Sequence, residues 1–217
     1  MNFKDTVFLN FKAIKNLILG TMLSLVALAF RVKLTHDFYL IFLAWNLLLA
    51  LLPFVLTLAI HQHPHWLSHR WKRMLLTLLW LLFLPNAPYI LTDFIHLQNS
   101  TPNMIGFDLA LIALFSATGF LAGVYSIKLM LDFNRPFNST IVMKLAVITI
   151  CLLCGYGVYL GRFIRLNSWD VFTNPQKVVI ESIVGLGHGM SWFITLTIGL
   201  LLFCSLRHLE TKKTGIL

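Results

Sequence analysis

Charged residues are scarce in this chain. Asp, Glu, Lys and Arg make up 12% of its 217 residues, whereas about 25% is typical of soluble globular proteins. A soluble domain of this size would lack the charged side chains that normally cover its surface. Hydrophobic residues account for 58% of the chain, an excess that five or six membrane spans of about 20 residues each would absorb. The composition therefore predicts a membrane protein with several spans and excludes an ordinary soluble domain.

Acidic residues are the scarcest charged class. Eight Asp and Glu stand against 17 Lys and Arg, which gives a formal net charge of +9. Such a charge is also typical of proteins that bind nucleic acids. Here the basic residues flank apolar stretches, where they specify membrane orientation instead. We therefore expect the lipid bilayer as a partner and no nucleic acid.

Six apolar stretches are long enough to be membrane spans. They cover residues 13–32, 38–60, 74–89, 107–131, 141–160 and 186–206. The loops between them are short, so we expect one all-α membrane domain over residues 1–217. The first stretch follows several lysines and ends in Ala27-Leu28-Ala29, a pattern that a cleaved signal peptide would also have. Because further spans follow at once, we expect it to be retained.

The basic residues divide unevenly between the two sides of a six-span chain. Twelve fall on the side of both termini: Lys4, Lys12, Lys15, Arg70, Lys72, Arg73, Lys128, Arg135, Lys144, Arg207, Lys212 and Lys213. Five fall on the other side: Arg31, Lys33, Arg162, Arg165 and Lys177. The positive-inside rule then predicts a cell-membrane protein with both termini in the cytoplasm.

The acidic residues divide in the opposite sense. Asp5, Asp132 and Glu210 fall inside, whereas the outer side has Asp37, Asp93, Asp108, Asp170 and Glu181. The outer side thus carries five charges of each sign. Balanced charge on a face with short loops predicts ion pairs rather than a solvated surface.

The third span ends in a proline-rich polar motif. Residues 83–96 read FLPNAPYILTDFIH, and two prolines three residues apart break or kink a helix. On a continuing α-helix, one face would hold Asn86, Tyr89, Asp93 and His96, and the opposite face Ile90, Leu91, Phe94, Ile95 and Leu97. The motif has two interpretations. It predicts either a kinked helix that runs along the membrane interface with its polar face in contact with water, or a broken helix that points Asp93 and His96 into an outward-facing cavity.

The fifth span ends in a second polar motif. Residues 155–170 read GYGVYLGRFIRLNSWD, with Arg162 and Arg165 one helical turn apart where the positive-inside rule disfavours them. They either lock loops together by pairing with Asp93, Asp108 or Asp170, or hold a phosphate or carboxylate through bidentate hydrogen bonds. We expect at least one of them to contact one of these carboxylates. Asn167 to Asp170 has the composition of a turn, and Trp169 suits a membrane interface.

The segment before the last span has helix signals of its own. Asn174 and Pro175 predict the start of a short helix, and its apolar stripe predicts a position on the membrane surface. His188, between Gly187 and Gly189 at the start of the last span, is either a structural hydrogen-bonding residue or a ligand contact. Asp108 begins the fourth span on the same outer side.

Metal and cofactor chemistry has little support. His61, His63, His65 and His69 crowd the second loop, but Pro64 interrupts them and no acid or cysteine completes a metal shell. Cys151 and Cys154 lie in the middle of a span, which favours packing over redox chemistry. Known nucleophile, metalloprotease and nucleotide-loop motifs do not occur. We expect no metal site and no cofactor.

The two polar motifs carry a resemblance to a known family. LPNAPYILTD at 84–93 and YLGRFIRLNSWD at 159–170, in this order on adjacent outer loops, resemble the bacterial multi-pass membrane family called domain of unknown function 1361. The resemblance covers about residues 38–206. Where the family has an aromatic pair before the fourth-span aspartate, this chain has Gly106-Phe107-Asp108. The resemblance implies the fold and the membrane location, and it implies no activity.

Three functions remain open. A protein that binds or transports a small anionic solute or lipid headgroup would use Arg162 and Arg165, surrounded by Asn86, Tyr89, Asp108, Asn167, Trp169, Asp170 and His188. A membrane-embedded enzyme acting on a lipid-linked phosphate would add Asp93 and His96 as acid–base groups or as metal ligands. A structural or assembly partner would need only the ion pairs. Transport is weakened because the inner halves of the spans offer only Asn46, Lys128 and Lys144 as polar residues.

Overall fold

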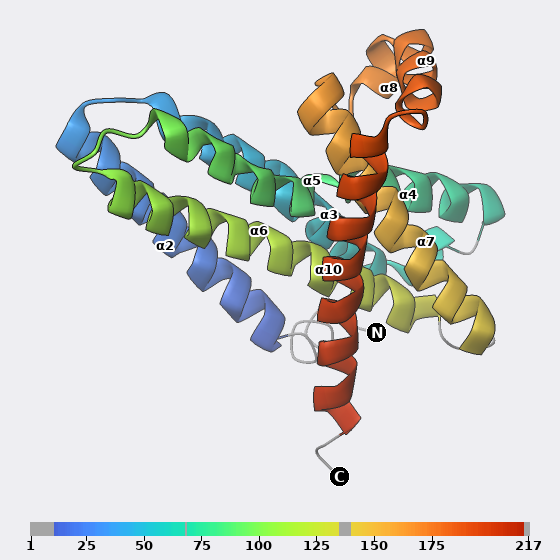
Figure 1. Ribbon diagram of the computed structural model, residues 1–217. Helices are drawn as coiled ribbons and strands as arrows, with labels where there is room; N and C mark the ends of the chain where they lie inside the picture. Colours follow the sequence, from blue (N-terminus) through green and yellow to red (C-terminus); the bar gives the residue numbers. More distant parts are fainter. Residues whose placement is uncertain (1–10, 68, 135–139, 215–217) are drawn as a thin grey trace.

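The computed structural model describes residues 11–67, 69–134 and 140–214. Within this part of the chain, every regular element is a helix and none is a strand (Figure 1). The expectations placed on Lys4, Asp5 and Arg135 lie outside the described residues.

Six helical stretches are long and apolar enough to cross a membrane. They are Phe11–Thr35, Tyr39–Gln62, Arg70–Asn99, Ile105–Asp132, Ile141–Ile164 and Gly189–Leu209. These stretches confirm the prediction of an all-α protein with six spans. The third stretch runs past its predicted end to Asn99, and the last one begins at Gly189 rather than at residue 186.

Several of these stretches are divided into shorter elements. In chain order they are α2 (Phe11–Thr35), η1 (Tyr39–Ile41), α3 (Phe42–Gln62), η2 (Pro64–Leu67), α4 (Arg70–Phe83), α5 (Asn86–Tyr89), η3 (Ile90–Asn99), α6 (Ile105–Asn134), α7 (Thr140–Tyr159), η5 (Leu160–Ile164), α8 (Asp170–Thr173), α9 (Pro175–Gly185) and α10 (Gly189–Thr214). The third span is broken between α4 and α5, as one of the two interpretations of its prolines predicts. The short helix before the last span is also present as α9, and the Asn174 side chain caps it by accepting from the Lys177 N–H.

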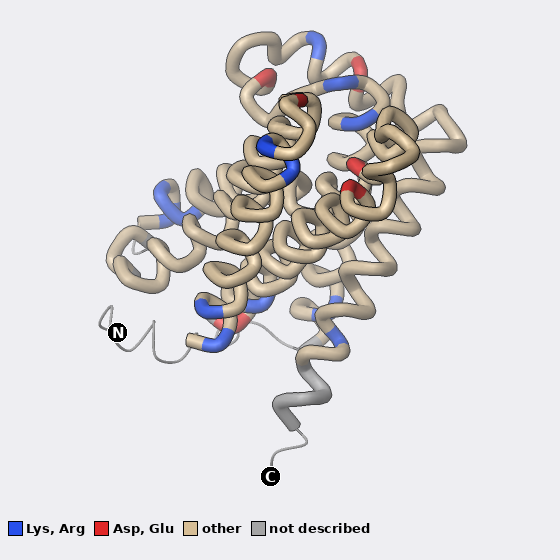
Figure 2. The backbone as a smooth tube through the Cα atoms, turned by 90° about the vertical axis from the view of Figure 1, so that its left-hand side faces the viewer, with Lys and Arg blue, Asp and Glu red and all other residues tan. Residues whose placement is uncertain are grey.

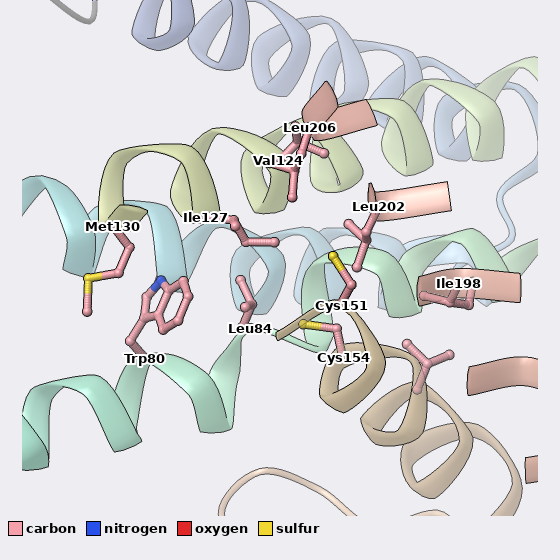
Figure 3. Packing of buried hydrophobic residues seen from close by; sticks show 11 residues of the cluster. Trp80, Leu84, Val124, Ile127, Met130, Cys151, Cys154, Ile198, Leu202 and Leu206 are labelled. Atoms are coloured by element: carbon pink, nitrogen blue, oxygen red, sulfur yellow. The ribbon is translucent and has the colours of Figure 1, made fainter. Parts of the chain in front are cut away.

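Helix α6 lies at the centre of the molecule. Helices α2 and α3 pack along it, and α7 and α10 pack against each other and cross this layer (Figure 1). The largest core cluster joins α4, α6, α7 and α10 through buried side chains such as Trp80, Ile127 and Leu202 (Figure 3). Cys151 and Cys154 belong to this cluster and are 2% and 0% exposed, as expected of cysteines that serve packing.

Polar groups inside the bundle are paired across helices. The Trp80 indole N–H donates to the Ser126 hydroxyl at 2.8 Å, and Ser126 shares a second hydrogen bond of 2.8 Å with Thr57. Hydrogen bonds of this kind link α3, α4 and α6 where no water is available.

Charge is segregated along the bundle. In Figure 2 acidic positions gather with basic ones at the upper end of the molecule, whereas the opposite end is mainly basic. We call the end where Asp37, Asp93 and Asp108 lie the aspartate end. Helix α2 ends there and α6 begins there, so this end brings together residues that are far apart in the sequence.

Candidate functional site

The proline break in the third span is held by the side chain of Asn86 within the span and by Ser168 from a later loop. Pro85 and Pro88 have no N–H, so the helical hydrogen bonds of this turn are incomplete. The Asn86 amide donates to Phe83 O at 2.8 Å, and the Ser168 hydroxyl donates to Leu82 O at 3.1 Å. Asn86 also donates to Ser168 at 3.0 Å. The break is therefore satisfied by protein groups, as a membrane interior requires.

Neighbouring helices approach this break closely. A Cβ atom at Gly157 of α7 would lie 2.5 Å from Pro85 Cγ, and one at Gly123 of α6 would lie 2.6 Å from Ala87 Cβ. Any side chain at these two glycines would push the helices apart. The break is thus clamped between α6 and α7.

After the break the chain continues as a 3₁₀ helix rather than an α-helix. With three residues per turn, η3 places Asp93, His96 and Asn99 in line on one face. The prediction that Asp93 and His96 share a face is confirmed. The prediction that Ile90 lies on the face opposite Asp93 is wrong, because Ile90 precedes Asp93 by one 3₁₀ turn and both are fully buried.

Asp93 forms the central ion pair of the site. One carboxylate oxygen accepts from Arg162 Nη2, and the other accepts from the Asn46 amide at 2.8 Å. The Asp93 side chain is 0% exposed and that of Arg162 is 16% exposed. Arg162 Nε donates to the Thr92 hydroxyl at 2.7 Å, so the guanidinium uses several donors at once. This pair confirms the expectation that an arginine of the second motif meets a carboxylate.

A π-helical turn positions the two arginines differently. The turn η5 covers Leu160–Ile164 and ends at Arg165 in the left-handed conformation, with φ 62°. Arg162 lies within the turn, and its guanidinium stacks 4.7 Å from the centre of the Tyr89 ring. Arg165 is exposed at the end of the turn. Arg162 is therefore part of the ion pair with Asp93, and Arg165 is not.

His96 connects the ion pair to the surface of the aspartate end. Its Nδ1 lies 2.7 Å from the Tyr39 hydroxyl, and its Nε2 lies 3.4 Å from Arg162 Nη1. Because a guanidinium can only donate, Nε2 must be the accepting nitrogen and Nδ1 must carry the proton. The Asn99 amide also donates to Tyr39, at 2.6 Å. Both ring nitrogens of His96 are thus engaged.

Asp108 has a different partner from the one expected. Its carboxylate accepts from Nε and Nη2 of Arg31 at 3.2 and 3.4 Å, and both side chains are almost fully buried, at 0% and 5% exposure. The third arm of the guanidinium donates to the carbonyl and carboxylate of Asp37 at 2.9 and 3.0 Å. This second ion-pair cluster joins α2 to α6, away from Arg162 and Arg165.

The exposed member of that cluster is Asp37. The backbone N–H of Tyr39, followed by the guanidinium of Arg31, holds the pKa of the Asp37 carboxyl below its usual range. The Asp37 carboxylate therefore stabilises the folded protein fully above the ordinary pKa of an aspartate. This stabilisation is lost as the pH falls through the lowered pKa of the folded state.

A cavity of about 450 Å³ lies beside the Asp93–Arg162 pair. Its walls come from α3, α4, α7 and η5, and the loop 166–169 with α8 and α9 covers it. Most of the lining side chains are apolar. Four of the predicted ligand-binding residues contribute to the lining: Asn86, Tyr89, Asn167 and Trp169. Seven predicted site residues lie outside it: Asp93, His96, Asp108, Arg162, Arg165, Asp170 and His188.

Two of these seven support the loops around the cavity. Asp170 accepts from the backbone N–H of Asn167 at 2.6 Å and so holds the turn that precedes α8. The His188 ring lies 2.8 Å from the Tyr159 hydroxyl, which ties the start of α10 to α7. His188 therefore takes the structural hydrogen-bonding role that was one of its two interpretations.

The histidine-rich loop remains separate from this site. His63 stacks on Trp66, with ring centres 4.8 Å apart, and its ring centre lies 5.7 Å from that of His65. Across the described part of the chain, no group of three or more His, Cys, Asp or Glu side chains is placed to hold a metal ion.

Sequence reasoning missed several residues of the site. Asn46 was placed in the inner half of the second span, but it lies at the aspartate end and binds Asp93. Arg31 was counted among the outer charges expected to form ion pairs, but it was not assigned to a site, and Tyr39, Thr92 and Asn99 were not proposed as site residues. One signal was available for Arg31, because a buried charge near the end of an apolar span requires a partner.

One comparison with known proteins gave a match. The family model described as "Protein of unknown function (DUF1361)" matches residues 45–204, which is more than half of the chain. The matched range includes both polar motifs and the cavity, and it leaves out α2 with Arg31. No curated protein and no solved structure matches the chain.

Proposed function

Because the chain belongs to the family of proteins of unknown function DUF1361, whose description names no activity, we propose a function from the site geometry: the protein is a multi-pass membrane protein that binds an amphipathic, lipid-like molecule in the cavity between α3, α4 and α7. The observation that carries this proposal is the cavity itself. Its volume of about 450 Å³ falls within the range of roughly 300–1,000 Å³ that is typical of small-molecule sites.

The lining favours a ligand with a long apolar part. Seven of the 21 lining residues are leucines, and five of these belong to α3, α4 and α7. Three lining residues are also open to the surface, since Trp45, Leu78 and Leu153 are 54%, 55% and 44% exposed. These residues lie on helices long enough to cross a membrane, so the opening would face acyl chains rather than water. A ligand could then enter sideways from the bilayer.

Several polar groups line the cavity. Asn46 lines it and at the same time binds Asp93. Asn86 and Ser168 line it near the proline break. A few polar groups in an apolar cavity fix the orientation of an amphipathic ligand. Because Asn46 binds Asp93, the polar part of the ligand would lie towards the aspartate end.

The catalytic alternative receives less support. Asp93 is fully buried and its two oxygens are occupied by Arg162 and Asn46. Both nitrogens of His96 have partners. A general acid or base needs to reach the substrate within hydrogen-bonding distance, and neither side chain lines the cavity. We assign Asp93, Arg162 and His96 to holding the cavity wall rather than to a reaction.

Filling the cavity should abolish ligand retention. Leu78 lines the cavity and is 55% exposed, so the Leu78→Trp variant can place an indole in the opening without disturbing the core. We expect native mass spectrometry of the purified protein to show about tenfold less bound phospholipid for this variant, a loss of roughly 1.4 kcal/mol in binding free energy.

Leu75→Trp is the matched control. Leu75 lies on the same helix, is 49% exposed and does not line the cavity, so this variant should retain as much lipid as the unmodified protein. Equal retention by both variants would contradict the proposed binding site.

We also propose that the aspartate end faces outward and that both termini are cytoplasmic in the cell membrane. The support is the excess of basic residues on the side of the termini, twelve of 17. In a chain whose native cysteines are replaced by alanine, single cysteines at Asn99 and Thr173 should react with an impermeant reagent added to intact cells. Cysteines at Lys12 and Arg73 should react only after permeabilisation. The reverse pattern would overturn the orientation.

A further inference from the structure

Arg165 has an unusual backbone conformation, with a positive φ angle. Among the described residues, only His36 and Arg165 are non-glycine residues with positive φ, at 53° and 62°. The left-handed conformation disfavours side chains other than glycine, asparagine and aspartate. Arg165 directly follows the π turn Leu160–Ile164. Both π turns and left-handed residues other than glycine are frequent at functional sites in proteins. An arginine at this position therefore requires an explanation.

The guanidinium of Arg165 is available for binding. Arg31 and Arg162 are each committed to buried carboxylates. Within the described residues, no hydrogen bond or ion pair reaches the side chain of Arg165, and the residue is exposed. The acid nearest along the chain, Asp170, is occupied by the N–H of Asn167 and the hydroxyl of Thr173.

Arg165 lies at the edge of the cavity. Leu166, which follows Arg165 in the chain, lines the cavity, and so does Gly161, four residues before it. The backbone N–H groups of Arg165 and Leu166 both donate to Leu160 O. This pair of hydrogen bonds fixes the segment against the cavity wall.

Exposed aromatic residues surround this segment. Phe163 and Trp169 are 47% and 38% exposed, and aromatic side chains are enriched where a membrane meets water. Arg165 therefore lies at the depth of lipid headgroups, directly beside a cavity suited to an apolar chain.

We propose that Arg165 binds the phosphate of an anionic phosphate ester whose apolar part occupies the cavity. This inference rests on the proposed lipid-binding function and specifies its ligand class. The guanidinium would hold the phosphate through paired, charge-assisted hydrogen bonds. The same chemistry is offered by a phospholipid headgroup and by a water-soluble phosphate ester, and the experiment below distinguishes these two sources.

The test uses the full chain in bilayer nanodiscs with two photoactivatable lipids. Phosphatidylglycerol carries a net negative charge, whereas phosphatidylcholine is zwitterionic. We expect phosphatidylglycerol to label the cavity-lining peptides of the unmodified protein more strongly than phosphatidylcholine. In the Arg165→Gly variant this labelling should fall about tenfold, which is the loss of one hydrogen-bonded charge contact.

Glycine is the informative replacement because it adopts positive φ without strain. Arg165→Gly should therefore keep or raise the thermal unfolding midpoint while it loses labelling, a combination that a structural role for Arg165 would not produce. Lys33→Gln is the matched control, since Lys33 is an exposed basic residue of α2, and neither it nor its neighbours in the chain line the cavity. Labelling of Arg165→Gly at the level of the unmodified protein would overturn the assignment.

Leu78→Trp separates failure of this inference from failure of the proposed function. If Leu78→Trp lowers labelling and Arg165→Gly does not, the cavity binds lipid and the phosphate contact is wrong. If neither variant lowers labelling, the cavity proposal fails as well. Excess glycerol phosphate distinguishes the sources: no competition indicates a lipid headgroup, and competition that is lost in Arg165→Gly indicates a soluble phosphate ester at the same side chain.

Discussion

The Arg31→Ala variant is expected to lose about 3–5 kcal/mol of its unfolding free energy, because this is the typical cost of breaking a buried ion pair by removing one partner. Asp108 is 0% exposed and takes two hydrogen bonds from Arg31. Without the guanidinium, its carboxylate would remain charged and unpaired between α2 and α6. The measurement is thermal and denaturant unfolding of the purified chain in detergent, together with its accumulation in membranes.

Two further variants make this result specific. Lys33 is exposed two residues along the same helix, so Lys33→Ala removes a positive charge from the same helix end and should change stability little. The double variant Arg31→Met with Asp108→Leu removes both charges and should recover most of the loss, since an apolar pair of similar volume is often tolerated in place of a buried ion pair. A stable Arg31→Ala protein would mean that α2 is not held by this pair.

The Asp93–Arg162 pair should be the second most sensitive point of the structure. Arg162→Ala leaves the fully buried Asp93 with only Asn46 as a partner, and we expect a loss of about 3 kcal/mol. Arg162→Lys keeps the charge but cannot reach Thr92 and Asp93 together, because an ammonium group lacks the planar fork. Its expected loss is smaller, at about 1–2 kcal/mol.

Arg165→Lys is the comparison for both Arg162 variants. Arg165 lies three residues after Arg162, and its side chain makes no hydrogen bond or ion pair with the described residues. The stability of the Arg165→Lys variant should therefore stay at the level of the unmodified protein. If Arg162→Lys were as stable as Arg165→Lys while lipid binding fell, Arg162 would be a ligand contact rather than part of the cavity wall.

The sequence was sufficient to predict the six spans and the break in the third one. Long apolar runs leave only helices as membrane-crossing structures, and Pro85 and Pro88 cannot complete a regular helix. The start of α9 at Asn174 and Pro175 was equally predictable, because capping depends on local residues alone. These features follow from short-range chemistry.

The partners within the site were not predictable in the same way. Which carboxylate meets which arginine depends on how α2, η3 and η5 pack around α6. The change from α-helix to 3₁₀ helix at Ile90 also changes the direction of the Asp93 side chain from the one that a continuous α-helix would give it. Sequence spacing left an ion-pair lock and an anion site as alternatives for both arginines, and it could not show that Arg162 is the one that pairs with Asp93.

Lipid binding in the cavity can be seen directly in an experimental density map of the protein in nanodiscs that contain phosphatidylglycerol. We expect an elongated density between α3, α4 and α7, with its apolar part against Leu78 and its polar end beside Arg165. A cavity that holds only water, or one closed by the movement of Trp45 and Leu153 towards each other, would contradict the claim that this protein binds a lipid-like ligand there.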